Sequence, residues 1–299
     1  MSRYDYIVTF AVEFAILAGG LLVYRLAAIA FTGPEFGEYV LARRNVSLLQ
    51  LPLLMGLSVG VTRFIALAID DPAQQARVQL AATLIAGTAA ALAAVALVVL
   101  ARPLAFLLFG TPELHGLTRA LVPALAGAVF HGVAYGMLRG RLAMRAANAL
   151  QLLNLGIIPP AVLALRPESV TEVILGTGIG WCVSACGVLA WTLVRVNRPA
   201  LDRRALWATA RDLARYGVPR VPGDAALGAL FALPVMLTSH VAGVTAAGFV
   251  GVGVAVVSLM GAPFAPIGHI VLPTASARFR RGDRAGLRRD SFRLVRVAV

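Results

Sequence analysis

Long apolar runs, each separated from the next by a short polar segment, set the pattern of this chain. A helix needs about 20 mostly apolar residues to cross the hydrocarbon of a bilayer, and the pattern predicts eight such spans. They lie at Ile7–Phe31, Val46–Ile69, Val78–Ala101, Leu117–Leu138, Ala147–Leu165, Val170–Val194, Gly217–Ser239 and Thr245–Leu272. The fifth span is the weakest because polar residues and prolines interrupt it: Asn148, Gln151, Asn154, Pro159 and Pro160. The pattern predicts an all-α, polytopic membrane bundle.

The connection Arg195–Tyr216 carries a helical pattern of its own. Its apolar and basic positions fall on different helical faces, with Leu206, Ala210, Leu213 and Gly217 on one and Arg204, Arg211 and Arg215 on another. Trp207 suits a membrane interface. We predict an amphipathic helix on the cytoplasmic membrane surface, and an ordinary solvated basic loop is the alternative.

The composition is that of a membrane protein. Apolar residues make up 59% of the 299 residues even without glycine, and charged residues make up 14%. An average soluble domain has about 45–50% apolar residues with glycine included, and about 25% charged residues. The net charge is +13, a value that a nucleic-acid-binding protein also reaches. Here the basic residues, all of them arginines, lie between apolar runs, so we expect no nucleic-acid partner.

The distribution of arginines predicts the orientation of the chain. With the N-terminus in the cytoplasm, 20 arginines fall in cytoplasmic segments and 5 in outer segments, the latter being Arg43, Arg44, Arg102, Arg119 and Arg166. Cytoplasmic loops of membrane proteins carry the excess of basic residues. We therefore expect a multi-pass protein of the plasma (inner) membrane with a cytoplasmic N-terminus. Its arginine-rich cytoplasmic loops are expected to contact anionic membrane lipids.

A weak internal repeat relates the first two spans to the seventh and eighth. A shift of 210 residues aligns Gly33 with Gly243 and Leu49 with Leu259. Six spans separate the copies, so the repeat is parallel, about an axis normal to the membrane. This divides the chain into a six-helix lobe (1–198), an amphipathic linker (199–216) and the start of a second lobe (217–299). Residues 294–299 resemble the first turn of a ninth span, so we expect the second lobe to be incomplete here.

No catalytic motif accompanies these spans. The sequence has no HExxH, P-loop or GxSxG pattern, and its four histidines are scattered over different segments. Cys182 and Cys186 share one helical face, which allows a metal pair, but two small residues in a packed membrane helix is the favoured interpretation. We expect no metal, no cofactor and no enzymatic activity. A scaffold or an enzyme of glycan assembly stays open as an alternative.

Ionisable residues within the apolar spans are the sharpest functional signal, because a charge near the bilayer centre costs roughly 2.5–3.5 kcal/mol on insertion scales. Glu13, Arg63 and Asp224 are predicted to lie at one depth on the cytoplasmic side of the midplane, with Glu13 and Arg63 forming an ion pair. A purely structural pair, or snorkelling to the interface, is the alternative. Arg25 lies near the outer interface, where snorkelling is favoured.

Two stretches resemble a known family. Residues 31–39 read FTGPEFGEY and are followed by GLSVGVTRFIA at 56–66, while YGVPRVPGD at 216–224 is similar to the entry into a second lobe. In order and spacing these motifs resemble the polysaccharide-biosynthesis transporters. Those are the O-antigen flippase-like members of the multidrug/oligosaccharidyl-lipid/polysaccharide exporter superfamily.

The resemblance implies 12 to 14 helices in two lobes around a central cavity. It also implies translocation of lipid-linked oligosaccharides by alternating access. The polyprenyl-pyrophosphate group of such a substrate is anionic, so Arg63 is the expected ligand, with Glu13 or Asp224 coupling to a cation and Arg25 as a further cavity candidate. A cation-coupled multidrug exporter of the same fold is the alternative. A net cationic cavity favours the glycolipid, and a net anionic cavity favours the drug.

Overall fold

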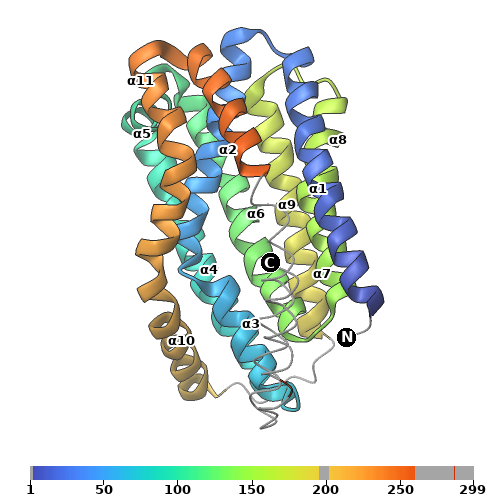
Figure 1. Ribbon diagram of the computed structural model, residues 1–299. Helices are drawn as coiled ribbons and strands as arrows, with labels where there is room; N and C mark the ends of the chain where they lie inside the picture. The colour runs from blue at the N-terminus through green and yellow to red at the C-terminus, as the bar shows by residue number, and fades with distance from the viewer. Residues whose placement is uncertain (1–2, 195–201, 260–285, 287–299) are drawn as a thin grey trace.

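A bundle of long helices makes up the part of the chain that the structure, a computed structural model, describes: residues 3–194, 202–259 and 286 (Figure 1). No β-strand occurs among these residues. Six of the described helical stretches are long and apolar enough to cross a membrane, and a bent helix pair adds a seventh. The predicted all-α membrane bundle is confirmed.

Four long helices coincide with predicted spans. These are α1 (Arg3–Ala30), α4 (Pro72–Val99), α6 (His115–Gly140) and α9 (Val170–Val194). The short helix α5 (Ala101–Phe109) and a 3-10 turn, η1 (Pro112–Leu114), connect α4 to α6. The glycines at four-residue spacing on α6, Gly132, Gly136 and Gly140, lie directly against α2 and α3, as small residues at helix crossings do.

The second span differs from the prediction because its helix begins earlier. Helix α2 (Gly33–Leu54) and helix α3 (Leu57–Leu67) meet at a 46° bend, where Met55 and Gly56 have positive φ angles. At the start of α2, Glu35 accepts a hydrogen bond from the backbone nitrogen of Thr32 at 3.0 Å, which is half of a capping box. The prediction that Arg43 and Arg44 lie in an outer segment is therefore wrong, since both lie inside α2.

The fifth span is a single crossing despite its polar residues. It consists of α7 (Met144–Gln151), a π-helical segment η2 (Leu152–Ile157) and α8 (Ile158–Ala164). The two prolines occupy the first turn of α8, where a missing backbone N–H is tolerated best. The weakest of the predicted spans is thus confirmed.

Helix α10 (Arg203–Gly217) forms where the amphipathic helix is predicted, and its place on the cytoplasmic membrane surface stays a prediction. Residues 195–201 of that prediction lie outside the described part of the chain. Its buried side, which includes Leu213 and Gly217, packs against α3 and α4, while Arg204, Arg211 and Arg215 are exposed. Asp202 caps its N-terminus by accepting a hydrogen bond from the backbone nitrogen of Arg204.

Helix α11 (Val221–Leu259) follows the 3-10 turn η3 (Val218–Arg220) and consists of two arms joined at Gly243. Gly243 has φ 85° and ψ 170°, a conformation that a residue with a Cβ rarely adopts. Figure 1 shows the first arm rising to the end of the bundle and the second arm descending from it. The break falls between the predicted seventh and eighth spans, and the remainder of the eighth, from residue 260, lies outside the described residues.

The register between α2 and the second arm of α11 supports the internal repeat. A Cβ on Gly248 would lie 2.9 Å from Cα of Gly37, and a Cβ on Gly251 would overlap the side chain of Val40. The members of each pair are 211 positions apart, close to the 210-residue shift. The two helices therefore run parallel in nearly equal register, as a parallel repeat about an axis along the bundle requires. The division into lobes stays a prediction.

The residues predicted to lie outside and those predicted to lie in the cytoplasm are at opposite ends of the bundle. In Figure 1, the connections from α5 to α6 and from α8 to α9 lie at the end of the bundle opposite the start of α1, and the end of α6 and helix α10 lie at the end where α1 starts. The first two connections contain Glu113 and Glu168, Arg141 directly follows α6, and Arg204 belongs to α10. We expect single cysteines at Glu113 and Glu168, in a Cys182→Ala, Cys186→Ala background, to react with an impermeant thiol reagent in intact cells. Cysteines at Arg141 and Arg204 should react only after permeabilisation. Labelling of these two sites in intact cells would show that the chain has the opposite orientation.

Candidate functional site

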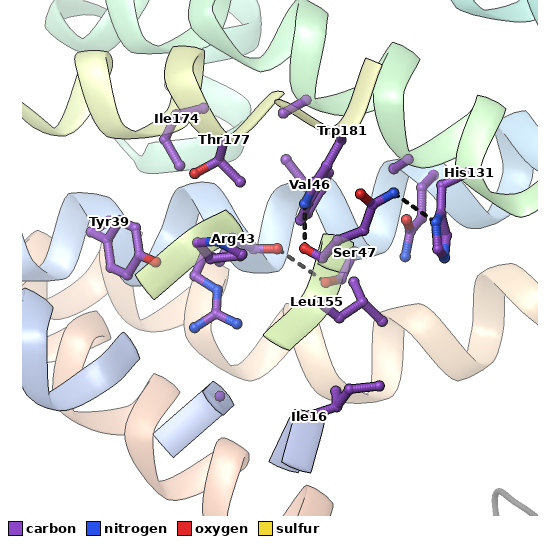
Figure 2. A pocket seen from close by; sticks show the side chains of 16 residues that line it. Ile16, Tyr39, Arg43, Val46, Ser47, His131, Leu155, Ile174, Thr177 and Trp181 are labelled. Carbon is purple, nitrogen blue, oxygen red and sulfur yellow. Dashed lines mark hydrogen bonds between the residues drawn. The ribbon is translucent and has the colours of Figure 1, made fainter. Parts of the chain in front are cut away.

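A cavity of about 260 Å³ lies inside the first six spans, between α1, α2, α6, α9 and the η2–α8 segment (Figure 2). Most of its wall is apolar, with Ile16, Val46, Leu155 and Ile174 among the lining residues. A few polar side chains converge on it, which is the usual composition of a small-molecule site.

Arg43 supplies the cation of this cavity. Its guanidinium carbon lies 5.0 Å from the ring centroid of Tyr24 and 5.8 Å from that of Tyr39. The Nη1 nitrogen is buried and has no hydrogen-bond partner among the described residues. Aromatic faces attract a cation by about 0.5–2 kcal/mol each, which offsets only part of the cost of removing a charge from water. The arginine therefore has unused capacity to donate to an anion.

A polar wall opposite α2 is organised around Asn154 in the π-helical segment. Its amide nitrogen lies 2.8 Å from Nδ1 of His131, and its amide oxygen accepts a hydrogen bond from the Ser184 hydroxyl at 2.5 Å. The backbone carbonyl of Asn154 accepts a further bond from Trp181 Nε1 at 2.5 Å. A π-helical segment interrupts the regular backbone ladder. The indole and the imidazole are thereby held in fixed orientations at the cavity surface.

A second cavity, of about 390 Å³, lies on the other side of α2, against α11. Arg44 lines it and donates from Nη2 to the carbonyl of Gly251 at 3.2 Å, while its Nε is buried without a partner among the described residues. Neighbouring residues of a helix point about 100° apart, so the adjacent arginines enter different cavities. Ser47 and Gln50 line both cavities and so connect them across α2.

The charge of the two cavities is positive. Arg43 and Arg44 are among their lining residues, and no aspartate or glutamate of the described chain is. A net cationic cavity is the criterion for an anionic ligand in the sequence analysis, and both cavities meet it.

Glu13 and Arg63, predicted to pair, have different neighbours. Glu13 is half-buried on α1, accepts a hydrogen bond from Gln151 Nε2 at 3.0 Å, and lies close enough to Tyr135 and Arg139 of α6 to interact with both electrostatically. Arg63 is exposed on α3, with its guanidinium carbon 4.9 Å from the ring centroid of Tyr216. The structure does not bring these two residues together.

Asp224 and Arg25 also lie outside the two cavities. Asp224 is half-buried in the first turn of α11, and Arg25 is exposed on α1. None of the four residues predicted from the sequence lines either arginine cavity. Their roles in binding or coupling stay predictions.

Sequence reasoning missed Arg43 and Arg44, although a signal for them was present. Thr32 followed three positions later by Glu35, with Pro34 between them, is an N-terminal helix signature. A helix that starts at Gly33 carries Arg43 about 15 Å along its axis at 1.5 Å per residue. Both arginines then fall well inside a membrane span, where an ionisable residue indicates a functional site.

No protein-family model and no curated protein matches this sequence. Solved structures do resemble the fold. The MATE multidrug transporter DinF-BH has a TM-score of 0.73 at 13% identity, with 93% of this chain and 65% of that chain covered. MATE in the straight conformation has a TM-score of 0.68 at 18% identity, with 98% and 70% covered.

A third similar structure is the outward-facing conformation of a multidrug resistance MATE family transporter of the MOP superfamily. Its TM-score is 0.66 at 19% identity, with 98% of this chain and 69% of that chain covered. The chain thus spans about two thirds of the length of these transporters. The fold that the sequence motifs imply is thus supported, while membership of the superfamily and of its flippase branch stays a prediction. The chain has the membrane fold of MATE family transporters of the MOP superfamily, over about two thirds of their length.

Proposed function

We propose that this chain acts in the export of lipid-linked oligosaccharides carried on polyprenyl pyrophosphate. The fold resembles that of exporters, and the positive charge of the two cavities favours an anionic substrate. Alternating access between two lobes then moves the substrate across the plasma membrane, as the family resemblance implies.

The observation that carries the proposal is the pair of arginines on α2. Each guanidinium has a buried nitrogen without a partner among the described residues, and no carboxylate of the described chain lines either cavity. Guanidinium and phosphate form short, often bidentate, charge-assisted hydrogen bonds. The phosphoryl groups of a pyrophosphate can accept such bonds from the arginine of whichever cavity they enter.

A cation-coupled multidrug exporter is the second candidate, and Glu13 favours it. This carboxylate lies on α1 within a polar cluster that contains Gln151, Tyr135 and Arg139. The solved structures that resemble this chain include multidrug transporters. In this alternative the Glu13 carboxylate binds and releases the coupling cation, while the drug binds against apolar side chains of the cavity wall.

Binding to the purified chain in lipid nanodiscs separates the two candidates. Trp181 lines the same cavity as Arg43 and reports ligand binding by its fluorescence. We expect a short-chain polyprenyl pyrophosphate to bind at least about tenfold more tightly than the matching uncharged polyprenol, since a charge-assisted contact contributes about 1.5–3 kcal/mol. A cationic dye should not displace it.

The opposite pattern supports the multidrug exporter. In that case the dye binds more tightly than the pyrophosphate, and Glu13→Gln removes dye binding while Arg43→Gln leaves it unchanged. Equal affinity for the pyrophosphate and the polyprenol contradicts the proposal, because it removes the role of the arginine cavities.

A further inference from the structure

Two arginines from different segments meet on one aromatic ring near the end of the bundle where α1 starts. The guanidinium carbon of Arg63 on α3 lies 4.9 Å from the ring centroid of Tyr216, and that of Arg220 in η3 lies 5.8 Å from the same centroid. The ring itself is held in place by an edge-to-face contact with Phe64, at 6.0 Å and 83°. A Cβ on Gly60 would lie 3.3 Å from the ring. Tyr216 is therefore held in place, with the guanidinium carbons of both arginines within 6 Å of its ring centroid.

Neither cation is neutralised within the described chain. Arg63 and Arg220 are both exposed, and no hydrogen bond or ion pair joins either of them to another described residue. Each contact with the ring contributes about 0.5–1 kcal/mol at an exposed site, while the two like charges repel each other. An anion that binds both guanidinium groups offsets that repulsion and accepts hydrogen bonds from each of them.

The surroundings of this pair are those of a membrane interface. Tyr216 belongs to the amphipathic helix α10, whose Trp207 is 75% exposed and whose Arg204, Arg211 and Arg215 face outward. Indole rings and basic residues of amphipathic helices concentrate at the level of lipid headgroups. The anion available at that level is the phosphate of a lipid.

An apolar groove begins at the same bend of the chain. It has a volume of about 690 Å³ and lies between α2, α4 and α10, with Met55, Leu92 and Ala210 among its lining residues. Gly56, next to Met55, lies against Arg220, whose Cδ is 3.1 Å from the position of a Cβ on Gly56. The Met55 edge of the groove thus lies close to Arg220.

From this geometry we infer that Arg63, Tyr216 and Arg220 form a binding site for the phosphate of an anionic phospholipid, with an acyl chain in the adjoining groove. The site differs from the arginine cavities and does not depend on what the protein transports. The bound lipid links α3 to η3, and so joins the bent second span to the start of α11.

Lipid binding to the purified full chain tests this site. We expect native mass spectrometry to show retained phosphatidylglycerol, in preference to phosphatidylcholine, for the unaltered chain. Arg63→Gln combined with Arg220→Gln should weaken phosphatidylglycerol binding about tenfold or more, since each lost charge-assisted contact changes affinity by about that factor. If the double variant is poorly folded, the single variants decide, each with a smaller loss in the same direction.

The matched control is Arg204→Gln combined with Arg211→Gln, which removes the same charge from exposed positions of α10. This control should retain phosphatidylglycerol binding. An equal loss in the control shows a diffuse charge effect and overturns the site, as does undiminished binding in the Arg63/Arg220 variant. Millimolar inorganic phosphate should not displace the lipid. Displacement would identify the occupant as a soluble anion and overturn the assignment to a lipid.

Discussion

Replacing Arg43 by glutamine is expected to reduce the affinity for polyprenyl pyrophosphate by about tenfold to a hundredfold, while the protein remains inserted and folded. The substitution keeps a polar, hydrogen-bonding side chain, although a shorter one, and removes the charge that the cavity presents to its ligand. The expected loss corresponds to about 1.5–3 kcal/mol for charge-assisted hydrogen bonds. Titration of the purified variant by Trp181 fluorescence, followed by a translocation assay in proteoliposomes, measures the two effects separately.

Two further variants show whether the loss belongs to the cavity. Arg43→Lys should recover part of the affinity, because the charge returns without the bidentate fork. Arg102→Gln removes an equal charge from an exposed position on α5 and should leave affinity unchanged. Arg63→Gln should have a smaller effect than Arg43→Gln, because Arg63 does not line the cavity. The interpretation of the cavity is refuted if Arg43→Gln binds the pyrophosphate normally.

A single methyl group at Gly178 is expected to destabilise the bundle strongly. Gly178 of α9 faces the backbone of α6, and a Cβ there would lie 2.7 Å from the carbonyl carbon of Pro123 and overlap the nitrogen of Ala124. Both atoms belong to the backbone, so α6 and α9 must move apart. Overpacking of this kind costs about 1–3 kcal/mol, and occasionally more. Thermal unfolding of the detergent-purified Gly178→Ala variant, monitored by circular dichroism, measures the loss.

The same helix offers the control. Gly187 of α9 is exposed, and no atom lies within 4 Å of the position that its Cβ would take. Gly187→Ala should leave the unfolding temperature unchanged or raise it slightly, because alanine is a better helix former than glycine by about 1 kcal/mol. Equal destabilisation by the two substitutions would show that the α6–α9 contact is not the cause.

Hydropathy suffices to predict the spans, because the requirement for about 20 apolar residues acts on each helix separately. The break at Gly243 is predictable for a related reason, since the gap between the seventh and eighth apolar runs falls there. The start of α2 escapes this reasoning because two adjacent arginines, at positions 43 and 44, look too costly for a span. The rings of Tyr24 and Tyr39 and the carbonyl of Gly251 partly offset that cost. Gly251 is more than 200 positions away in the chain.

The candidate site is less predictable than the fold for the same reason. Glu13, Arg63 and Asp224 are chosen by their position along the length of a span. That position does not indicate which face of the helix points to a cavity. Asn154 is recognisable in the sequence only as an interruption of the fifth span. Its three contacts with His131, Trp181 and Ser184 come from two other helices. A hydropathy pattern along one segment cannot predict contacts between different helices.

The π-helical segment between α7 and α8 is equivalent to one extra residue in an otherwise regular helix, and this determines where a change in length is tolerated. Because the wider turn absorbs the extra residue, removing one residue from Leu152–Ile157 restores a regular α-helical ladder and leaves the helix faces beyond it almost unrotated. Removing one residue from the regular helix α8 instead turns the residues that follow it by about 100°. Leu163, which is 3% exposed on α8, keeps its place in the core after the first deletion and rotates out of the core after a deletion that precedes it in α8. A one-residue deletion between α8 and α9, at residues 165–169, alters only a connection. Within the fifth span, the loss of one residue is therefore accommodated best in the π-helical segment, where it removes the present contacts of Asn154 but not the packing of α8.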